Sequence, residues 1–79
     1  MTVNEAYEKI KKEIPDLKTN IIEDWGPFYA VTNGEEGDMV DDDWKIDKKT
    51  GKISEFSIDD MSREMQKHSD DWYPTAYKI

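Results

Sequence analysis

The stretch Phe-Tyr-Ala-Val-Thr at residues 28–32 constrains the fold of this chain more than any other feature. Aromatic and β-branched residues favour extended backbone, and turn-forming pairs, Gly26-Pro27 and Asn33-Gly34, bound the run on both sides. The preceding residues 19–25 also follow the period of a strand. The sequence therefore predicts two antiparallel strands joined by a hairpin turn at residues 25–27.

A second hairpin is predicted in residues 43–56. Trp44 and Ile46 fall on one face of a strand, because side chains alternate along extended backbone. The carboxylate of Asp47 can accept hydrogen bonds from amides two or three residues on, and Gly51 can adopt the left-handed conformation that closes the turn. Residues 52–56 then return as the last strand. We expect an antiparallel sheet of three to four strands.

An amphipathic helix is predicted at the N-terminus, at residues 3–14. Thr2 and Glu5 have the spacing of a capping box, and Pro15 cannot continue the helical hydrogen bonds. The apolar positions recur with helical spacing at Val3, Ala6, Tyr7, Ile10 and Ile14. A helix therefore precedes the strands.

A second helix is predicted after the strands, with Ser57 as N-cap and an end near Ser69. Its apolar stripe comprises Ile58, Met61, Met65, His68 and Trp72. Helix, antiparallel strands and helix together predict an α+β fold of two layers.

The chain of 79 residues is expected to form one domain, residues 1–79, held together by packing, because it has no cysteine for a disulfide. Of the three tryptophans, we expect Trp25 and Trp44 in the core and Trp72 at the surface. Residues 73–79 are a possible tail, whose aromatic side chains either fold back on the core or meet a partner.

The net charge of −8 is concentrated in one segment. Six of the nine residues 35–43 are acidic, so this segment accounts for most of the excess. Such a charge repels nucleic acids and anionic lipids, and it attracts basic proteins. The sequence has neither an export signal nor an apolar run near the roughly 20 residues that span a bilayer. We therefore expect a cytoplasmic protein that binds no membrane and no nucleic acid directly.

The motifs of common catalytic sites are missing from the sequence. His68 is the only histidine, and no G-x-S-x-G nucleophile motif accompanies it. The four glycines are too far apart to form a phosphate-binding loop. Counted from Asp41 or from Asp47, the ligand positions of an EF-hand loop are not acidic throughout. We expect no enzyme, no cofactor and no specific metal site.

The acidic segment leaves three interpretations open. It can be a docking surface for a basic protein, a solvated connection with no charge-directed partner, or a set of carboxylates that serves a small metal-dependent enzyme. Closely spaced carboxylates approximate the charge density of a nucleic-acid backbone, so a protein that normally grips DNA or RNA would be attracted to them. The apolar Met39 would give such a contact a desolvated centre.

Residues 28–31 together with residues 44–53, WKIDKKTGKI, carry a resemblance to known domains. The stretch resembles the strand and hairpin pattern W-x-V-D-x-x-T-G-x-V/I of small bacterial domains, among them PepSY-like domains and YrhB-like toxin-immunity proteins. The resemblance implies an α+β domain and, through the immunity-like group, a cytosolic inhibitor that neutralises another protein by binding. PepSY-like domains are typically exported, and the missing export signal counts against that group. The acidic segment lies outside the shared pattern, so the resemblance does not identify a partner.

The sequence thus predicts a stoichiometric inhibitor, of an immunity or phage anti-defence type, that acts as a monomer or weak homodimer. Its expected partner is a basic protein such as a nuclease or another nucleic-acid enzyme. The predicted contact residues are Glu35, Glu36, Asp38, Met39, Asp41, Asp42, Asp43, Asp59, Asp60, Glu64 and Trp72.

Overall fold

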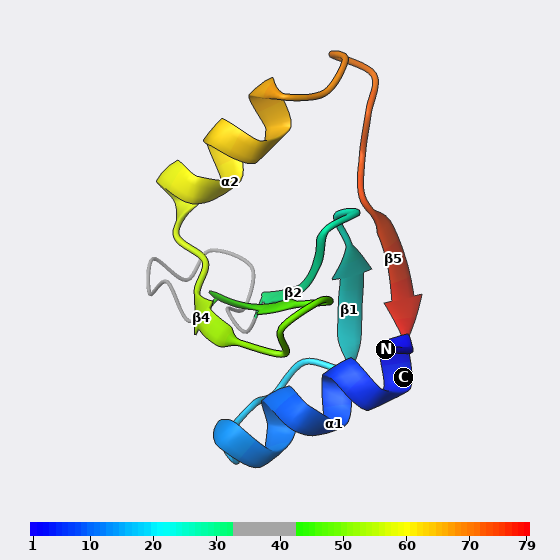
Figure 1. Cartoon of the computed structure of the whole chain (residues 1–79), viewed down its shortest axis with the longest axis vertical. Helices are drawn as coiled ribbons and strands as arrows, with labels where there is room; N and C mark the ends of the chain where they lie inside the picture. Colours follow the sequence, from blue (N-terminus) through cyan, green and yellow to red (C-terminus); the bar gives the residue numbers. More distant parts are fainter. Residues whose placement is uncertain (33–42) are drawn as a thin grey trace.

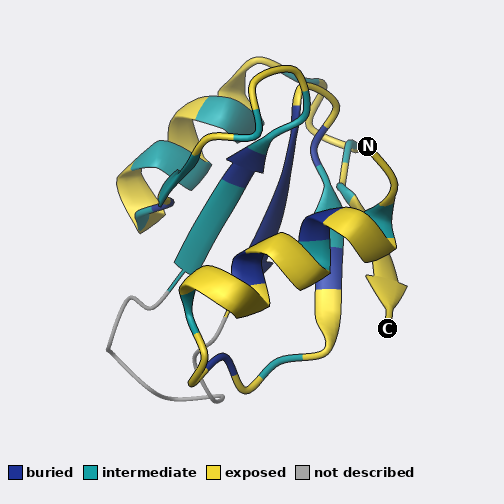
Figure 2. Cartoon of the chain, turned by 60° about the horizontal axis from the view of Figure 1, so that its bottom comes forward, coloured by how far each residue is buried: buried dark blue, intermediate teal, exposed yellow. Residues whose placement is uncertain are grey.

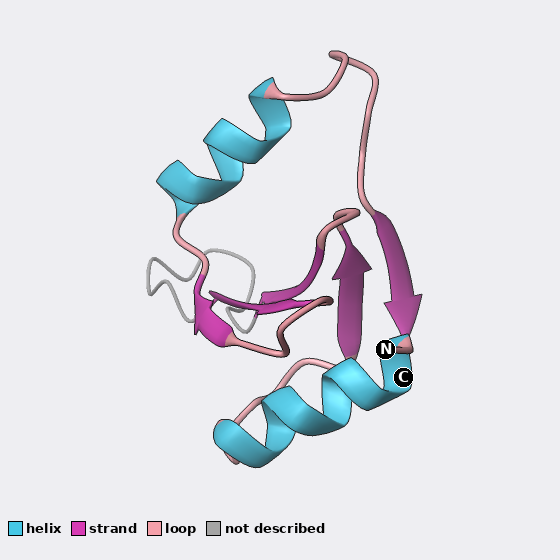
Figure 3. Ribbon diagram, viewed as in Figure 1, coloured by secondary structure: helices cyan, strands magenta, loops and turns pink. Residues whose placement is uncertain are grey.

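The structure is a computed structural model of the chain, and it describes residues 1–32 and 43–79. Figures 1 and 3 show a mixed α+β fold in which strands lie between two helices. The elements in chain order are α1 (Val3–Glu13), β1 (Ile21–Asp24), β2 (Phe28–Thr32), β3 (Asp43–Asp47), β4 (Ile53–Glu55), α2 (Ile58–Gln66) and β5 (Thr75–Lys78). The predicted fold class, α+β, is confirmed.

Helix α1 forms where the sequence predicts it. Thr2 Oγ1 accepts a hydrogen bond from the amide of Glu5 at 3.2 Å, and the Glu5 carboxylate accepts from the amide of Thr2 at 3.1 Å. This reciprocal pair satisfies two amides that have no partner within the helix. Ala6 and Ile10 are fully buried beneath the helix, and Ile14 caps it just before Pro15.

The sheet has five antiparallel strands in the order β4-β3-β2-β1-β5. The first four form the predicted pair of hairpins, with Glu23 opposite Ala30 and Ala30 opposite Lys45. The expectation of three to four strands is wrong, because part of the possible tail, residues 73–79, forms β5. This strand pairs with β1 along its whole length and makes one edge of the sheet.

The two hairpins have the turn geometry that their sequences predict. In the first, the amide of Trp25 donates to the carbonyl of Phe28 at 3.0 Å, and Gly26 between them has φ 102°. In the second, Asp47 Oδ1 accepts from the amides of Lys49 and Thr50 at 2.7 and 2.8 Å. The hydrogen bond from the Thr50 amide is the largest cause that holds the pKa of Asp47 below its usual value, and the bond from the Lys49 amide is the next.

The two helices lie on opposite faces of the sheet (Figure 1), so the expectation of two layers is wrong. Tyr29 and Val31 of β2 pack with Ile10 of α1 in one cluster, whereas Phe28 and Ala30 pack on the other side. Strand β2 is therefore buried on both faces and needs a cover on each. Figure 2 shows the buried positions along the central strands and on the side of α1 that faces them.

Helix α2 covers the second face more lightly than α1 covers the first. Ser57 caps it as predicted, with its hydroxyl accepting from the amide of Asp60 at 3.2 Å. Met61 and Met65 are partly buried against Trp25, Phe28, Ala30 and Phe56, but no residue of α2 is fully buried. Ile58 lines the same cleft as Met61 and Met65, as the predicted apolar stripe requires, but it is 60% exposed.

Candidate functional site

A cleft of about 540 Å³ lies between α2 and the sheet, on the face away from α1. Glu23 of β1 and Trp25, the residue that follows β1, line it from the sheet, because residues two apart on extended backbone share a face. Met61 and Met65 line it from α2, and Pro74 lines it from the segment that leads into β5. The walls are mostly apolar, with one carboxylate among them.

The ring of Trp25 is held in place by other aromatic side chains. It stacks on Phe28 with ring centroids 5.9 Å apart, meets Phe56 edge-on at 5.2 Å, and contacts Trp72 at 5.5 Å. The adjoining turn adds to this order, since the amide of Gly26 donates to Asp24 Oδ1 at 2.9 Å. The prediction that Trp25 belongs to the core is confirmed, because the residue is only 4% exposed.

A buried indole N–H and a partly buried carboxylate lie close together in the cleft. Trp25 Nε1 is buried and has no hydrogen-bond partner within the described part of the chain. Burial raises the pKa of the Glu23 carboxyl above its usual 4.5, the nearby indole of Trp25 partly offsets the rise without completing a hydrogen bond, and the charge of Asp43 adds to it. The cleft thus contains a donor without a partner among the described residues and, near it, a carboxylate whose ionised form burial disfavours.

A second, smaller cleft of about 360 Å³ lies on the same face of the sheet, at the β3–β4 hairpin. Lys45 lines it, with its ammonium 5.2 Å from the ring centre of Phe28 and 5.5 Å from that of Phe56. At the neighbouring turn, Lys48 Nζ lies 2.7 Å from Asp24 Oδ1 and 4.4 Å from the ring centre of Tyr29. Both cations therefore engage groups of this chain.

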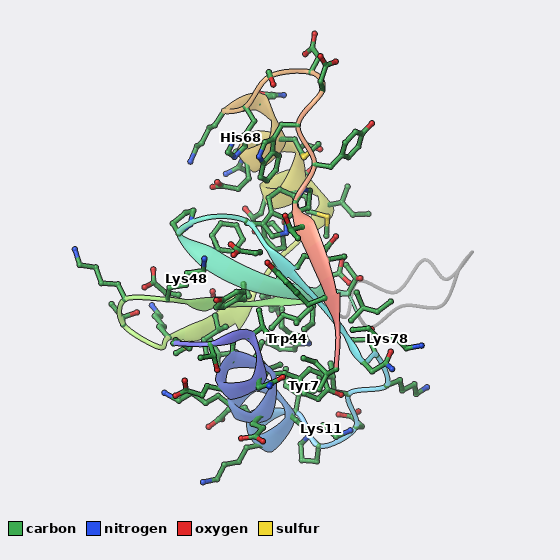
Figure 4. All side chains as sticks on the ribbon, turned by 90° about the vertical axis from the view of Figure 1, so that its right-hand side faces the viewer. Tyr7, Lys11, Trp44, Lys48, His68 and Lys78 are labelled. Carbon is green, nitrogen blue, oxygen red and sulfur yellow. The ribbon has the colours of Figure 1, made fainter. Side chains whose placement is uncertain are left out.

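The Lys48 contact also favours the ionised form of Asp24. Burial opposes ionisation of this carboxyl, but hydrogen bonds from Lys48 and from the amide of Gly26 outweigh it and hold the pKa below the usual value. Figure 4 shows Lys48 beside the sheet, Trp44 between the sheet and α1, and His68 on the opposite side, toward α2. Trp44 packs against the α1 side of the core but is only partly buried, so the prediction of a core position is confirmed in part.

The predicted contact residues on α2 have structural roles of their own. The Asp60 carboxylate accepts from the amide of Ser57 at 3.3 Å, and it lies 3.8 Å from Arg63. Its bonds with Ser57 hold the pKa of Asp60 below the usual value. Glu64 pairs with Lys67 at 3.0 Å. Asp59, in contrast, is exposed in the first turn of the helix.

Trp72 does not have the exposed position that we expected. It is partly buried against Trp25, and the ring of His68 stacks on it at a centroid distance of 3.7 Å. Its neighbour Tyr73 is 75% exposed, and Ile58, at the start of α2, is 60% exposed. Trp72 is therefore a packing residue that supports the wall of the cleft.

The acidic segment lies largely outside the described residues. Asp43 is described: it begins β3, stands opposite Thr32 of β2, and its carbonyl accepts from the amide of Phe56 at 2.9 Å. The other predicted contact residues of the segment, which the structure does not describe, are Glu35, Glu36, Asp38, Met39, Asp41 and Asp42.

Glu23 was not among the residues predicted from the sequence. Its signal was the spacing Ile21, Glu23, Trp25, which puts a carboxylate on the same face as a buried tryptophan.

Within residues 1–32 and 43–79, the structure contains no group of three or more acidic or histidine side chains placed to hold a metal ion. None of the described helices has the length and apolar character needed to cross a membrane.

Comparison with models of known protein families gives no match, and comparisons with curated proteins and with solved structures give none either.

Proposed function

We propose that this chain is a small cytoplasmic binding protein, without catalytic activity, that inhibits a basic partner by forming a stoichiometric complex with it. The proposed partner is a nuclease or another nucleic-acid enzyme, and the proposed role is that of an immunity or phage anti-defence protein. One observation carries the proposal: residues 35–43 contain six carboxylates, while the rest of the chain is nearly balanced in charge.

The spacing of these carboxylates supports a partner that normally binds nucleic acid. Duplex DNA presents one negative charge per roughly 1.7 Å of axis, and clustered carboxylates approach such a density more closely than an ordinary protein surface does. A protein surface rich in arginine and lysine therefore attracts both duplex DNA and clustered carboxylates. Long-range attraction of this kind raises the association rate and makes binding sensitive to salt.

Asp43, the one described residue of the acidic segment, lies close to the cleft. Thr32 and Asp43 are cross-strand partners at the end of the two central strands, and Thr32 also lines the cleft. Burial is the main cause of the raised pKa of Glu23, and the charge of Asp43 adds to it. The negative potential of Asp43 thus reaches the carboxylate inside the cleft.

Exposed apolar side chains beside the cleft supply the short-range part of the proposed contact. Ile58 lines the cleft and is 60% exposed, and the exposed Tyr73 directly precedes Pro74, another lining residue. Large exposed apolar groups beside a charged surface are typical of protein-binding sites. In this proposal Ile58 and Tyr73 replace Trp72 as the apolar contact residues. Asp59 is the acidic contact residue of α2.

The test compares capture of proteins by three forms of the chain. The loop variant carries Glu35→Gln, Glu36→Gln, Asp38→Asn, Asp41→Asn, Asp42→Asn and Asp43→Asn. The matched control variant neutralises six exposed acids elsewhere, through Glu8→Gln, Glu13→Gln, Asp16→Asn, Glu55→Gln, Asp70→Asn and Asp71→Asn. Each is immobilised, exposed to lysate of the source cells treated to remove nucleic acid, and eluted with increasing salt.

The proposal predicts a basic protein that the wild type and the control variant retain and that the loop variant loses. The purified partner should lose its own activity at a one-to-one ratio with the wild type. Equal retention by all three forms would show that the acidic segment does not direct binding, and retention without loss of partner activity would contradict inhibition.

A further inference from the structure

The cleft between α2 and β1 combines an apolar surface with a single carboxylate. Met61, Met65 and Pro74 form walls with no charge, and the Glu23 carboxylate stands among them beside the indole of Trp25. A group that fits these walls is apolar along its length and cationic at its end. Long basic side chains have this character, since their methylene stems pack on apolar surface while the charged head reaches a polar partner.

One hydrogen-bond donor of the cleft has no partner among residues 1–32 and 43–79. Trp25 is 4% exposed, and its Nε1–H has no partner among the described residues. A buried donor without a partner is costly, and a partly desolvated carboxylate is costly as well. A cation bound to one oxygen of Glu23 would favour the ionised carboxylate, whose other oxygen could then accept from Trp25 Nε1.

We propose that this cleft binds an arginine side chain presented by the basic partner. Arginine fits better than lysine, because its planar guanidinium is weakly hydrated, lies flat on aromatic surfaces and donates two parallel hydrogen bonds to a carboxylate. The volume of about 540 Å³ exceeds the size of one side chain and leaves room for the residues beside it. This inference rests on the proposed function only for the source of the arginine.

The surrounding charges favour a cation in the cleft over an anion. Asp43 lies close enough to influence Glu23, and Asp59 is exposed on the first turn of α2, the helix that forms one wall. Lys45, on the same face of the sheet, is held over the rings of Phe28 and Phe56. An arriving guanidinium therefore meets attraction from the cleft and its rim.

The test is a titration of the ¹⁵N-labelled protein followed by NMR of the indole N–H groups. The three tryptophans give three indole signals, and the spectrum of a Trp25→Phe variant identifies that of Trp25. The probe is Nα-acetyl-arginine methylamide, and the matched probe is the citrulline derivative, which has nearly the same shape without the charge. The arginine probe should shift the Trp25 signal to saturation, and the citrulline probe should bind at least about tenfold more weakly, as expected for loss of a charged hydrogen-bonded pair.

Two variants make the test specific for the cleft. Glu23→Gln should weaken binding of the arginine probe about tenfold. Asp59→Asn removes the same charge from the exposed rim of α2 and should weaken binding less than threefold. The inference is overturned if the arginine probe leaves the Trp25 signal unmoved, if citrulline binds equally well, or if the two variants weaken binding equally.

Failure of this inference is distinguishable from failure of the proposed function. Specific arginine binding at Trp25, combined with charge-independent capture of cellular proteins, would keep the arginine site and reject the inhibitor that uses residues 35–43. Charge-dependent capture of a basic partner, with no response of Trp25 to the arginine probe, would keep the proposed function and reject the arginine site.

Discussion

Glu23 is an acidic residue at a partly buried position, where burial disfavours its ionised form. Its neighbours on β1 and β2 are core residues, Ile22 and Ala30, and burial raises the pKa of its carboxyl above 4.5. A group with a raised pKa in the folded state binds its proton more tightly there than in the unfolded chain. Stability therefore falls as the pH rises from 4.5 through the folded pKa, and the loss persists at higher pH.

The variant Glu23→Gln should accordingly be more stable than the wild type at pH 7, because glutamine does not ionise. The difference should shrink as the pH falls and vanish below 4.5, where Glu23 is protonated in both states. Urea denaturation across the pH range measures it, with Glu8→Gln, at an exposed position of α1, as the control. A wild type as stable as Glu23→Gln at neutral pH would contradict the burial of this carboxylate.

Gly51 closes the β3–β4 turn with φ 74°, a conformation that costs most residues steric strain. Free space is not the obstacle, since a Cβ at this position would meet only the flexible ends of Lys9 and Met1, at 3.6 and 3.9 Å. Gly51→Ala should therefore lower the free energy of unfolding by about 1 kcal/mol. Gly51→Asn should lower it less, because asparagine tolerates this conformation. The prediction is refuted if Gly51→Ala leaves the free energy of unfolding unchanged, or if Gly51→Asn lowers it more than Gly51→Ala does.

At the scale of elements, the two helices differ in how firmly the sheet holds them. Ile10 of α1 is fully buried against the sheet, whereas Ile58 of α2 is 60% exposed at the rim of the cleft. The helices also cover different faces, so their contributions to stability are separable (Figure 1). A lightly packed α2 leaves the cleft accessible from its side.

Three truncations, two at Ile10 and one at Ile58, measure this difference. Ile10→Ala should cost about 2–5 kcal/mol of unfolding free energy, through lost burial and the cavity that remains, and the milder Ile10→Val should cost about 1 kcal/mol. Ile58→Ala should change it by less than about 0.5 kcal/mol. Chemical denaturation of the three variants tests the contrast, and a large cost at Ile58 would mean that α2 packs more tightly than the structure shows.

The elements that the sequence predicted are those with local signals. The capping box of Thr2 and Glu5, the Asp47 to Gly51 turn and the Ser57 cap each act within a few residues, and each forms as expected. Strand β5 was not predicted, because it exists through its pairing with β1, fifty and more residues earlier in the chain. Long-range pairing leaves little trace in a short exposed segment such as residues 75–78.

The number of layers in the fold could have been predicted from the pattern of residues 28–31. Residues 28–31 are apolar without alternation, which is typical of a strand buried on both faces and so requires a cover on each. The candidate site depends on Glu23, whose alternation with Ile21 and Trp25 predicts a strand but does not by itself distinguish a carboxylate in a cleft from one in solvent. The acidic residues of the segment were prominent in the sequence, but only Asp43 of them is described.

At the scale of the whole molecule, the net charge of −8 opposes the compact state, because like charges are closer together in the folded protein than in the unfolded chain. Raising sodium chloride from about 0.01 M to about 1 M shortens the screening length from about 30 Å to about 3 Å. The urea midpoint of the wild type should therefore rise with salt, and that of the loop variant should rise less. Equal rises would mean that residues 35–43 contribute no repulsion in the folded state.

The association rate of the captured partner, measured against salt concentration, tests the central claim most directly. If residues 35–43 attract a basic surface, the rate for the wild type and for the control variant should fall steeply as salt rises, whereas the loop variant should bind more slowly at low salt and respond weakly. Equal salt dependence for all three forms would contradict a charge-directed partner.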